Sequence, residues 1–108
     1  MSRPKGTPRG GEGDWEVQII KSVIRAVSSI LAINYGRAVR IDYKRIVRYA
    51  PELKQYHSSV VRFAVDKWLG LEKCRTADDD YLYDRQCVQE QVQESINKAV
   101  VLVLDGGR

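Results

Sequence analysis

The chain has 108 residues, of which 44% are hydrophobic and 30% are charged, and its formal net charge is +4. This composition is typical of one globular domain. No apolar run approaches the length of a transmembrane helix, and no apolar segment follows the basic residues near the N-terminus, so we expect neither a membrane span nor a secretory signal. These features predict an intracellular protein.

The positive charge is concentrated in the middle of the chain. Residues 37–75 have a net charge of +6, whereas residues 76–108 have a net charge of −4. A basic segment beside an acidic one indicates a polarised surface with one face suited to a polyanion. The alternative is a solvated surface of mixed charge.

Residues that could perform catalysis or hold a metal are scarce. Cys74 and Cys87 are too few for a zinc site, because only His57 could join them. In an ordinary cytosol both would be free thiols, whereas in a hyperthermophile they could form an internal disulfide, and the Arg and Lys content is compatible with a thermophile. Asp78–Asp80 lacks the ligand spacing of a calcium loop. We therefore predict no enzyme, no cofactor and no metal site.

The N-terminal segment differs in composition from the rest. Residues 1–13 predict a disordered basic tail, which either lies along phosphates or is merely flexible. The folded domain is expected over residues 14–105. Asp14 is expected to cap a first helix, in which apolar residues recur every three or four positions from Trp15 onward. Gly36 is expected to end this helix in a left-handed conformation.

The next two elements are short. Alternating apolar and polar residues over 38–42 predict a strand. Asp42 is expected to cap a second helix over 43–50, and Pro51 to stop it, because the residue before a proline is pushed out of helical geometry.

A third helix follows a turn over residues 52–57. It is expected to begin at His57 or Ser58, to run to about Leu69 and to end at Gly70. Its inward-facing side chains are predicted to be Val61, Val65 and Trp68. We expect Trp15 and Trp68 to lie in the core.

The last part of the domain is predicted to combine a hairpin with a long helix. Residues 71–75 and 81–83 are expected to pair around the polar turn at 76–80. A final helix is expected from about Asp84 to about residue 105. Residues 100–104 alone would also fit a strand, but the helical pattern that precedes them favours a helix.

These elements predict a mainly α chain with a small β-hairpin (α+β), in the order α-β-α-α-β-β-α. Three segments stand out: the serine-rich Ser58–Arg62, the Leu-Gly-Leu exit within Trp68–Leu71, and the aromatic Tyr81–Tyr83. With them the chain resembles the winged-helix version of the helix-turn-helix DNA-binding domain, as in archaeal and viral regulators. It departs from that pattern in two places. The turn between the second and third helices lacks a glycine, and the tip of the hairpin (the wing), Asp78–Asp80, would repel phosphates.

The third helix is the predicted reader of a DNA groove. A helix fits the major groove, and its exposed N-terminal side chains reach base edges. Arg62 shares a face with Ser58 and Ser59 and would either read guanine or only pair with Asp66. The full set of residues predicted to bind nucleic acid is Arg40, Lys44, Arg45, Arg48, Lys54, Ser58, Ser59, Arg62, Lys67 and Arg75.

The resemblance also implies a homodimer through the first and last helices. Such a dimer would present two third helices to a pseudo-palindromic site. The alternative is that the apolar stripes of these helices cover only their own core.

Three functions follow from these features. The first is a double-stranded DNA-binding transcriptional regulator that uses the helix at 58–69 in the major groove and is cytoplasmic and associated with the nucleoid. The second is a non-sequence-specific chromatin, single-stranded DNA or RNA-binding protein, for which Tyr43, Tyr49 and Tyr56 could stack on bases. The third is a protein–protein assembly module without nucleic acid.

Overall fold

The computed structural model describes the backbone of residues 11–106 and the side chains of residues 15–98. The chain is mainly helical, and the described part contains a two-stranded antiparallel sheet. Its elements are α1 (Gly11–Ile33), β1 (Ala38–Arg40), α2 (Tyr43–Tyr49), the 3-10 helix η1 (Pro51–Gln55), α3 (Ser58–Phe63), the π-helical turn η2 (Ala64–Trp68), the 3-10 helix η3 (Leu71–Cys74), β2 (Leu82–Asp84) and α4 (Arg85–Gly106).

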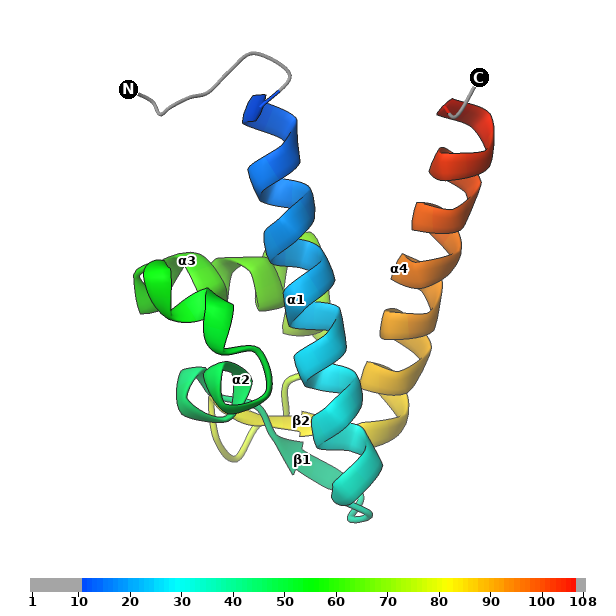
Figure 1. The fold of residues 1–108 in the computed structure, drawn as a ribbon. Coiled ribbons are helices and arrows are strands. Elements are labelled where there is room, and N and C mark those ends of the chain that lie inside the picture. Colours follow the sequence, from blue (N-terminus) through cyan, green and yellow to red (C-terminus); the bar gives the residue numbers. More distant parts are fainter. Residues whose placement is uncertain (1–10, 107–108) are drawn as a thin grey trace.

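α1 runs through the middle of the molecule. α2 and α3 lie on one side of it and α4 lies on the other, and the small sheet closes the end where α1 and α4 are nearest to each other (Figure 1). Away from the sheet, the N-terminal half of α1 and the C-terminal half of α4 diverge. The core draws fully or almost fully buried side chains from every layer: Ile19, Val23, Val27, Ile30, Ile46, Val61, Leu71, Tyr83 and Val88.

α1 differs from its prediction at both ends. It begins at Gly11, so residues 11–13 are helical, whereas residues 1–10 of the predicted tail lie outside the described residues. It ends at Ile33, where the Asn34 amide donates to the Ile30 carbonyl at 2.8 Å. The Asn34 side chain thereby satisfies one of the carbonyls that the end of a helix leaves without a partner. Gly36 does not take the left-handed conformation that was expected of it.

The prediction that Trp15 lies in the core is wrong. Trp15 is 44% exposed, and among the described side chains of α1 the first buried hydrophobic one is that of Ile19. Trp68 is partly buried against the core, as are Tyr43, Tyr49 and Tyr56.

α2 follows its prediction closely, whereas the segment predicted as a turn over residues 52–57 largely forms the 3-10 helix η1. The Asp42 carboxylate accepts from the Arg45 backbone N–H at 2.9 Å and caps α2, and η1 begins at Pro51. Glu52 then fastens η1 to α1, because its carboxylate accepts from the Ser22 hydroxyl at 2.6 Å. This hydrogen bond is the main reason that the pKa of Glu52 is lowered.

The third helix begins as predicted but is not uniform. His57 caps it, since Nδ1 accepts from the Ser59 backbone N–H at 3.1 Å. From Ala64 the helix widens into the π-helical turn η2, in which the Leu69 N–H reaches back to the Ala64 carbonyl at 2.9 Å. Gly70, with a φ of +79°, then reverses the chain in the left-handed region that suits glycine.

The predicted hairpin is wrong in its first strand, and the predicted element order is wrong with it. Leu71 and Cys74 are both buried, at a spacing of three that a helical turn can bury on one side, and the segment forms η3. β2 instead pairs with β1 in antiparallel register. Only a single bridge, between Arg75 and Tyr83, joins the segment after η3 to β2.

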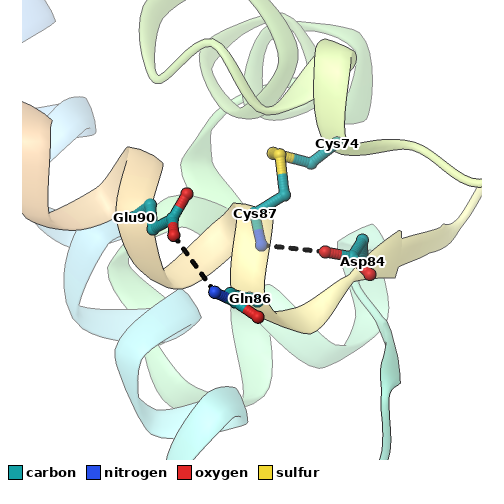
Figure 2. Close-up of a disulfide and its surroundings, with 5 residues drawn as sticks. All are labelled: Cys74, Asp84, Gln86, Cys87 and Glu90. Carbon is teal, nitrogen blue, oxygen red and sulfur yellow. Dashed lines mark hydrogen bonds between the residues drawn. A yellow bond between two sulfur atoms is a disulfide. The ribbon is translucent and has the colours of Figure 1, made fainter.

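A disulfide between Cys74 and Cys87 connects η3 to the first turn of α4 (Figure 2). The sequence left open whether these cysteines are free thiols or form a disulfide, and the structure has the disulfide. In the same turn, the Asp84 carboxylate accepts from the Cys87 backbone N–H at 3.0 Å, as a helix cap does (Figure 2). α4 then continues to Gly106, so the strand alternative for residues 100–104 is wrong.

Candidate nucleic-acid interface

The basic side chains of α2 and η1 form the clearest candidate surface, which we call the α2 cationic patch: Lys44, Arg45, Arg48 and Lys54. Lys44, Arg48 and Lys54 are exposed, and Arg45 is partly exposed. Lys44 and Arg48 are four positions apart and therefore share one face of α2. Within residues 15–98, no carboxylate forms an ion pair with any member of this patch. These charges are therefore available to an external anion.

The N-terminus of α3 lies beside this patch and carries hydroxyl groups. Ser58 and Ser59 are exposed. The Ser59 hydroxyl lies 2.9 Å from Nδ1 of His57, so the capping arrangement holds this side chain at the surface. Hydroxyls at this position can donate to or accept from base edges and phosphate oxygens.

An open pocket of about 460 Å³ separates the N-termini of α2 and α3. Its floor is apolar and includes Ile46, Val61 and Val65, which are buried. Polar side chains surround it, and they come from β1, α2, α3 and the loop before β2: Arg40, Asp42, Tyr43, Lys44, Ser58, Ser59, Arg62 and Tyr81. Five of the predicted nucleic-acid-binding residues therefore meet at one place: Arg40, Lys44, Ser58, Ser59 and Arg62.

Arg62, the predicted reader of guanine, is engaged inside the protein. Its Nε donates to the Asp66 carboxylate at 2.9 Å, and Nη2 donates to the Asp80 carbonyl at 2.8 Å. Its guanidinium also lies over the Tyr81 ring, 4.4 Å from the centroid. Reading a base would require Arg62 to leave these contacts, so the geometry favours the alternative of an intramolecular pair.

Asp66 is the centre of this network. Its side chain is almost buried, and it accepts from Arg75 at 2.5 Å and from the Tyr83 hydroxyl at 2.8 Å in addition to Arg62. Burial, together with the hydrogen bond to Asp66, raises the pKa of Tyr83 to about 12. The network thus ties the end of α3 to the wing, which we define as residues 75–84.

Sequence reasoning identified Asp66 only as a partner of Arg62. A signal was present, because Asp66 is the only carboxylate between Glu52 and Glu72 in a basic stretch. Its remaining partners, Arg75 and Tyr83, become visible only when the wing is folded back onto the helix.

The predicted cations outside the α2 cationic patch are also paired. Arg40 contacts Asp79 of the wing at 3.3 Å, and Lys67 contacts Glu72 at 2.5 Å. Neither Lys67 nor Arg75 lines the pocket beside α3. The wing tip was expected to repel phosphates, and the structure gives Asp79 a local role in holding Arg40.

Other kinds of site are not seen in the described part of the chain. Residues 15–98 contain no group of three or more His, Cys, Asp or Glu side chains placed to hold a metal ion. None of the described helices is both long enough and apolar enough to span a membrane. Comparisons of the chain with protein-family models, with curated proteins and with solved structures found no match.

Proposed function

We propose that this chain is a DNA-binding protein that holds double-stranded DNA with the α2 cationic patch and presents the N-terminus of α3 to the major groove. The observation that carries the proposal is the set of basic side chains without carboxylate partners within residues 15–98, beside the exposed Ser58 and Ser59. Lysine and arginine side chains of this kind neutralise phosphates and position a protein on a duplex.

The arrangement of elements supports a winged-helix version of this function. A helix and a short strand precede α2 and α3, and β1 pairs with the strand that leads into α4. In such a domain, α3 enters the groove and the helix before it contacts the backbone. The Arg62–Asp66 network then positions the wing against α3, and base contacts fall to Ser58 and Ser59. A role in transcriptional regulation is part of this proposal.

The test is binding of a duplex at several salt concentrations. The slope of log affinity against log salt is negative, and each lost phosphate contact should make it shallower by about 0.9. We expect Arg48→Ala to weaken binding and to make the slope shallower by about that amount. Fluorescence anisotropy of a labelled duplex measures both quantities.

Lys73→Ala is the matched control, because it removes the same charge from an exposed residue of η3, next to the disulfide to α4. It should leave the slope unchanged. An equal loss in both variants would mean that net charge, rather than the α2 cationic patch, drives binding, and this result would contradict the proposal.

The single-strand alternative can be separated with one competition experiment. Tyr43, Tyr49 and Tyr56 pack against the core, which leaves less of each ring for stacking on a base. We therefore expect the duplex to displace a labelled duplex at lower concentration than either of its single strands does. Preference for a single strand would favour the chromatin, single-stranded DNA or RNA alternative.

A further inference from the structure

Three aromatic side chains form a partly exposed cluster on the side of α1 that faces α3. The Trp15 and Trp68 rings meet edge to face with centroids 6.2 Å apart, and Phe63 meets Trp68 in the same way at 5.8 Å. With Ser59 and Val60 they line an open hollow of about 390 Å³, which we call the aromatic groove. Trp15 is 44% exposed and Phe63 is 50% exposed. Large aromatic surfaces left in water next to one another mark an interaction site.

The charges around the aromatic groove favour a basic occupant. On the side of α3 and η2, the neighbouring cations Arg62 and Lys67 already have carboxylate partners. Glu16, which directly follows Trp15, is exposed and forms no ion pair within residues 15–98. Residues 11–20 as a whole contain three carboxylates and neither lysine nor arginine. The start of α1 is therefore acidic, and it suits an occupant that is basic as well as apolar.

The ten residues that precede α1 have this chemistry. Their sequence is Met-Ser-Arg-Pro-Lys-Gly-Thr-Pro-Arg-Gly, with three cations and no carboxylate, and each proline is next to a cation. Prolines favour the extended polyproline II conformation, and aromatic grooves bind such segments because little conformational freedom remains to be lost. A guanidinium group can also lie over an aromatic face. One segment can therefore supply both the apolar and the basic contacts.

The segment is close enough to reach the groove of its own chain. Trp15 lies four positions after Gly11, where α1 begins, which is about 6 Å along a helix axis. In a polyproline II segment, which advances about 3.1 Å per residue, Pro4 and Pro8 would be about 12 Å apart. This separation is comparable to the two steps of 6.2 and 5.8 Å that join the three ring centroids. Gly10, directly before α1, gives the chain the backbone freedom to turn back toward the rings.

We propose that the aromatic groove binds residues 1–10 of its own chain, with the prolines on the rings and the cations toward the acidic start of α1. Tethering favours this segment over that of a second copy, because a tethered segment meets the groove at an effective concentration on the order of 1 mM. The sequence left two alternatives for the tail, lying along phosphates or being merely flexible, and the groove offers a third. The proposal does not depend on nucleic-acid binding. Ser59 lines both the groove and the pocket beside α3, so the bound segment would run next to the surface proposed to contact DNA.

The experiment is heteronuclear NMR spectroscopy of the isotope-labelled full chain. Trp15 and Trp68 are the only tryptophans, so their indole N–H signals report the groove, while the backbone amides of residues 2–10 other than the prolines report the segment. We expect heteronuclear NOE values for these amides close to those of the helices. We also expect NOE contacts between proline ring protons and the aromatic rings.

Two variants remove the contact from opposite sides. Phe63→Ser removes a ring from the groove without adding charge, and P4G/P8G removes both prolines while it leaves the sequence of the folded domain unchanged. Each should lower the ratio of bound to free segment by at least about tenfold, as loss of a central contact does. P4G/P8G should also shift the indole signals, although it changes no residue of the groove. Ile33→Ser is the matched control, since Ile33 is 56% exposed at the other end of α1 and should leave the segment bound.

Three results would overturn the proposal. The first is a wild-type chain whose amides over residues 2–10 give the low NOE values of a free terminus. The second is a segment that stays ordered in Phe63→Ser, which would place it elsewhere on the molecule. The third is ordering that increases with protein concentration, because the segment would then bind to a second copy.

Discussion

The side chain that most changes the view of the candidate site is Asp66. A nearly buried carboxylate with one partner would be costly, and this one has Arg62, Arg75 and Tyr83 around it. Because these partners come from α3 and the wing, removing the charge would leave two guanidinium groups facing each other without an anion. The network therefore sets the position of the wing rather than the recognition of a ligand.

The tyrosine of this network gives a prediction about pH. Burial raises the pKa of Tyr83 to about 12, above the ordinary value of 10.0 that it regains on unfolding. Tyr83 therefore stabilises the fold fully below about pH 10, and this contribution is lost as the pH rises through about 12. We expect the free energy of unfolding of the wild type to fall more steeply over this range than that of Tyr83→Phe.

Urea unfolding followed by circular dichroism at a series of pH values measures this difference. Tyr83→Phe should also be less stable than the wild type near neutral pH, by about 1–3 kcal/mol, because one hydrogen bond to a charged group is lost. If the two pH dependences were the same, Tyr83 would not ionise differently in the folded and unfolded chain, and the role given to its burial would be wrong.

At the scale of elements, the disulfide and the wing act together. Cys74 and Cys87 are separated by 13 positions, and the wing lies between them. The cross-link limits the freedom of this loop in the unfolded chain and joins η3 to the start of α4. It thereby supports the isolated bridge between Arg75 and Tyr83, beside which the Thr76 N–H donates to the Leu82 carbonyl at 2.8 Å.

We predict that the double variant C74S/C87S is less stable than the wild type by about 2–4 kcal/mol, the usual range for a loop of this length. Chemical denaturation with and without a reducing agent measures the effect. The reducing agent should destabilise the wild type and leave C74S/C87S unchanged. A wild type that is equally stable in its reduced form would show that the wing is held by the Asp66 network alone.

At the scale of the whole molecule, the charge is divided between the parts of the fold. The basic patch lies on α2 and η1, while the acidic C-terminal third of the sequence supplies the wing tip and much of α4. The proposed DNA contacts therefore lie in the basic part of the fold.

The sequence alone was sufficient for the features that depend on neighbouring residues. The Asp42 cap, the stop of α2 at Pro51, the start of the third helix at His57 or Ser58 and its end at Gly70 were all predicted, because capping and backbone restriction act within a few positions. The mainly helical fold with a small antiparallel sheet was also predictable, since the spacing of apolar residues reports which side of each helix is buried.

Tertiary structure decided the features that depend on distant partners. β2 pairs with β1 rather than with residues 71–74, because burial of Leu71 and Cys74 folds that segment into a 3-10 helix. The same packing brings the wing to α3, where Asp66 takes up Arg62. Of the cations predicted to bind nucleic acid, those of the α2 cationic patch are then the ones without an ion pair within residues 15–98. Sequence spacing carries no information on which of several charges will find an internal partner, because that choice depends on distances set only when the core closes.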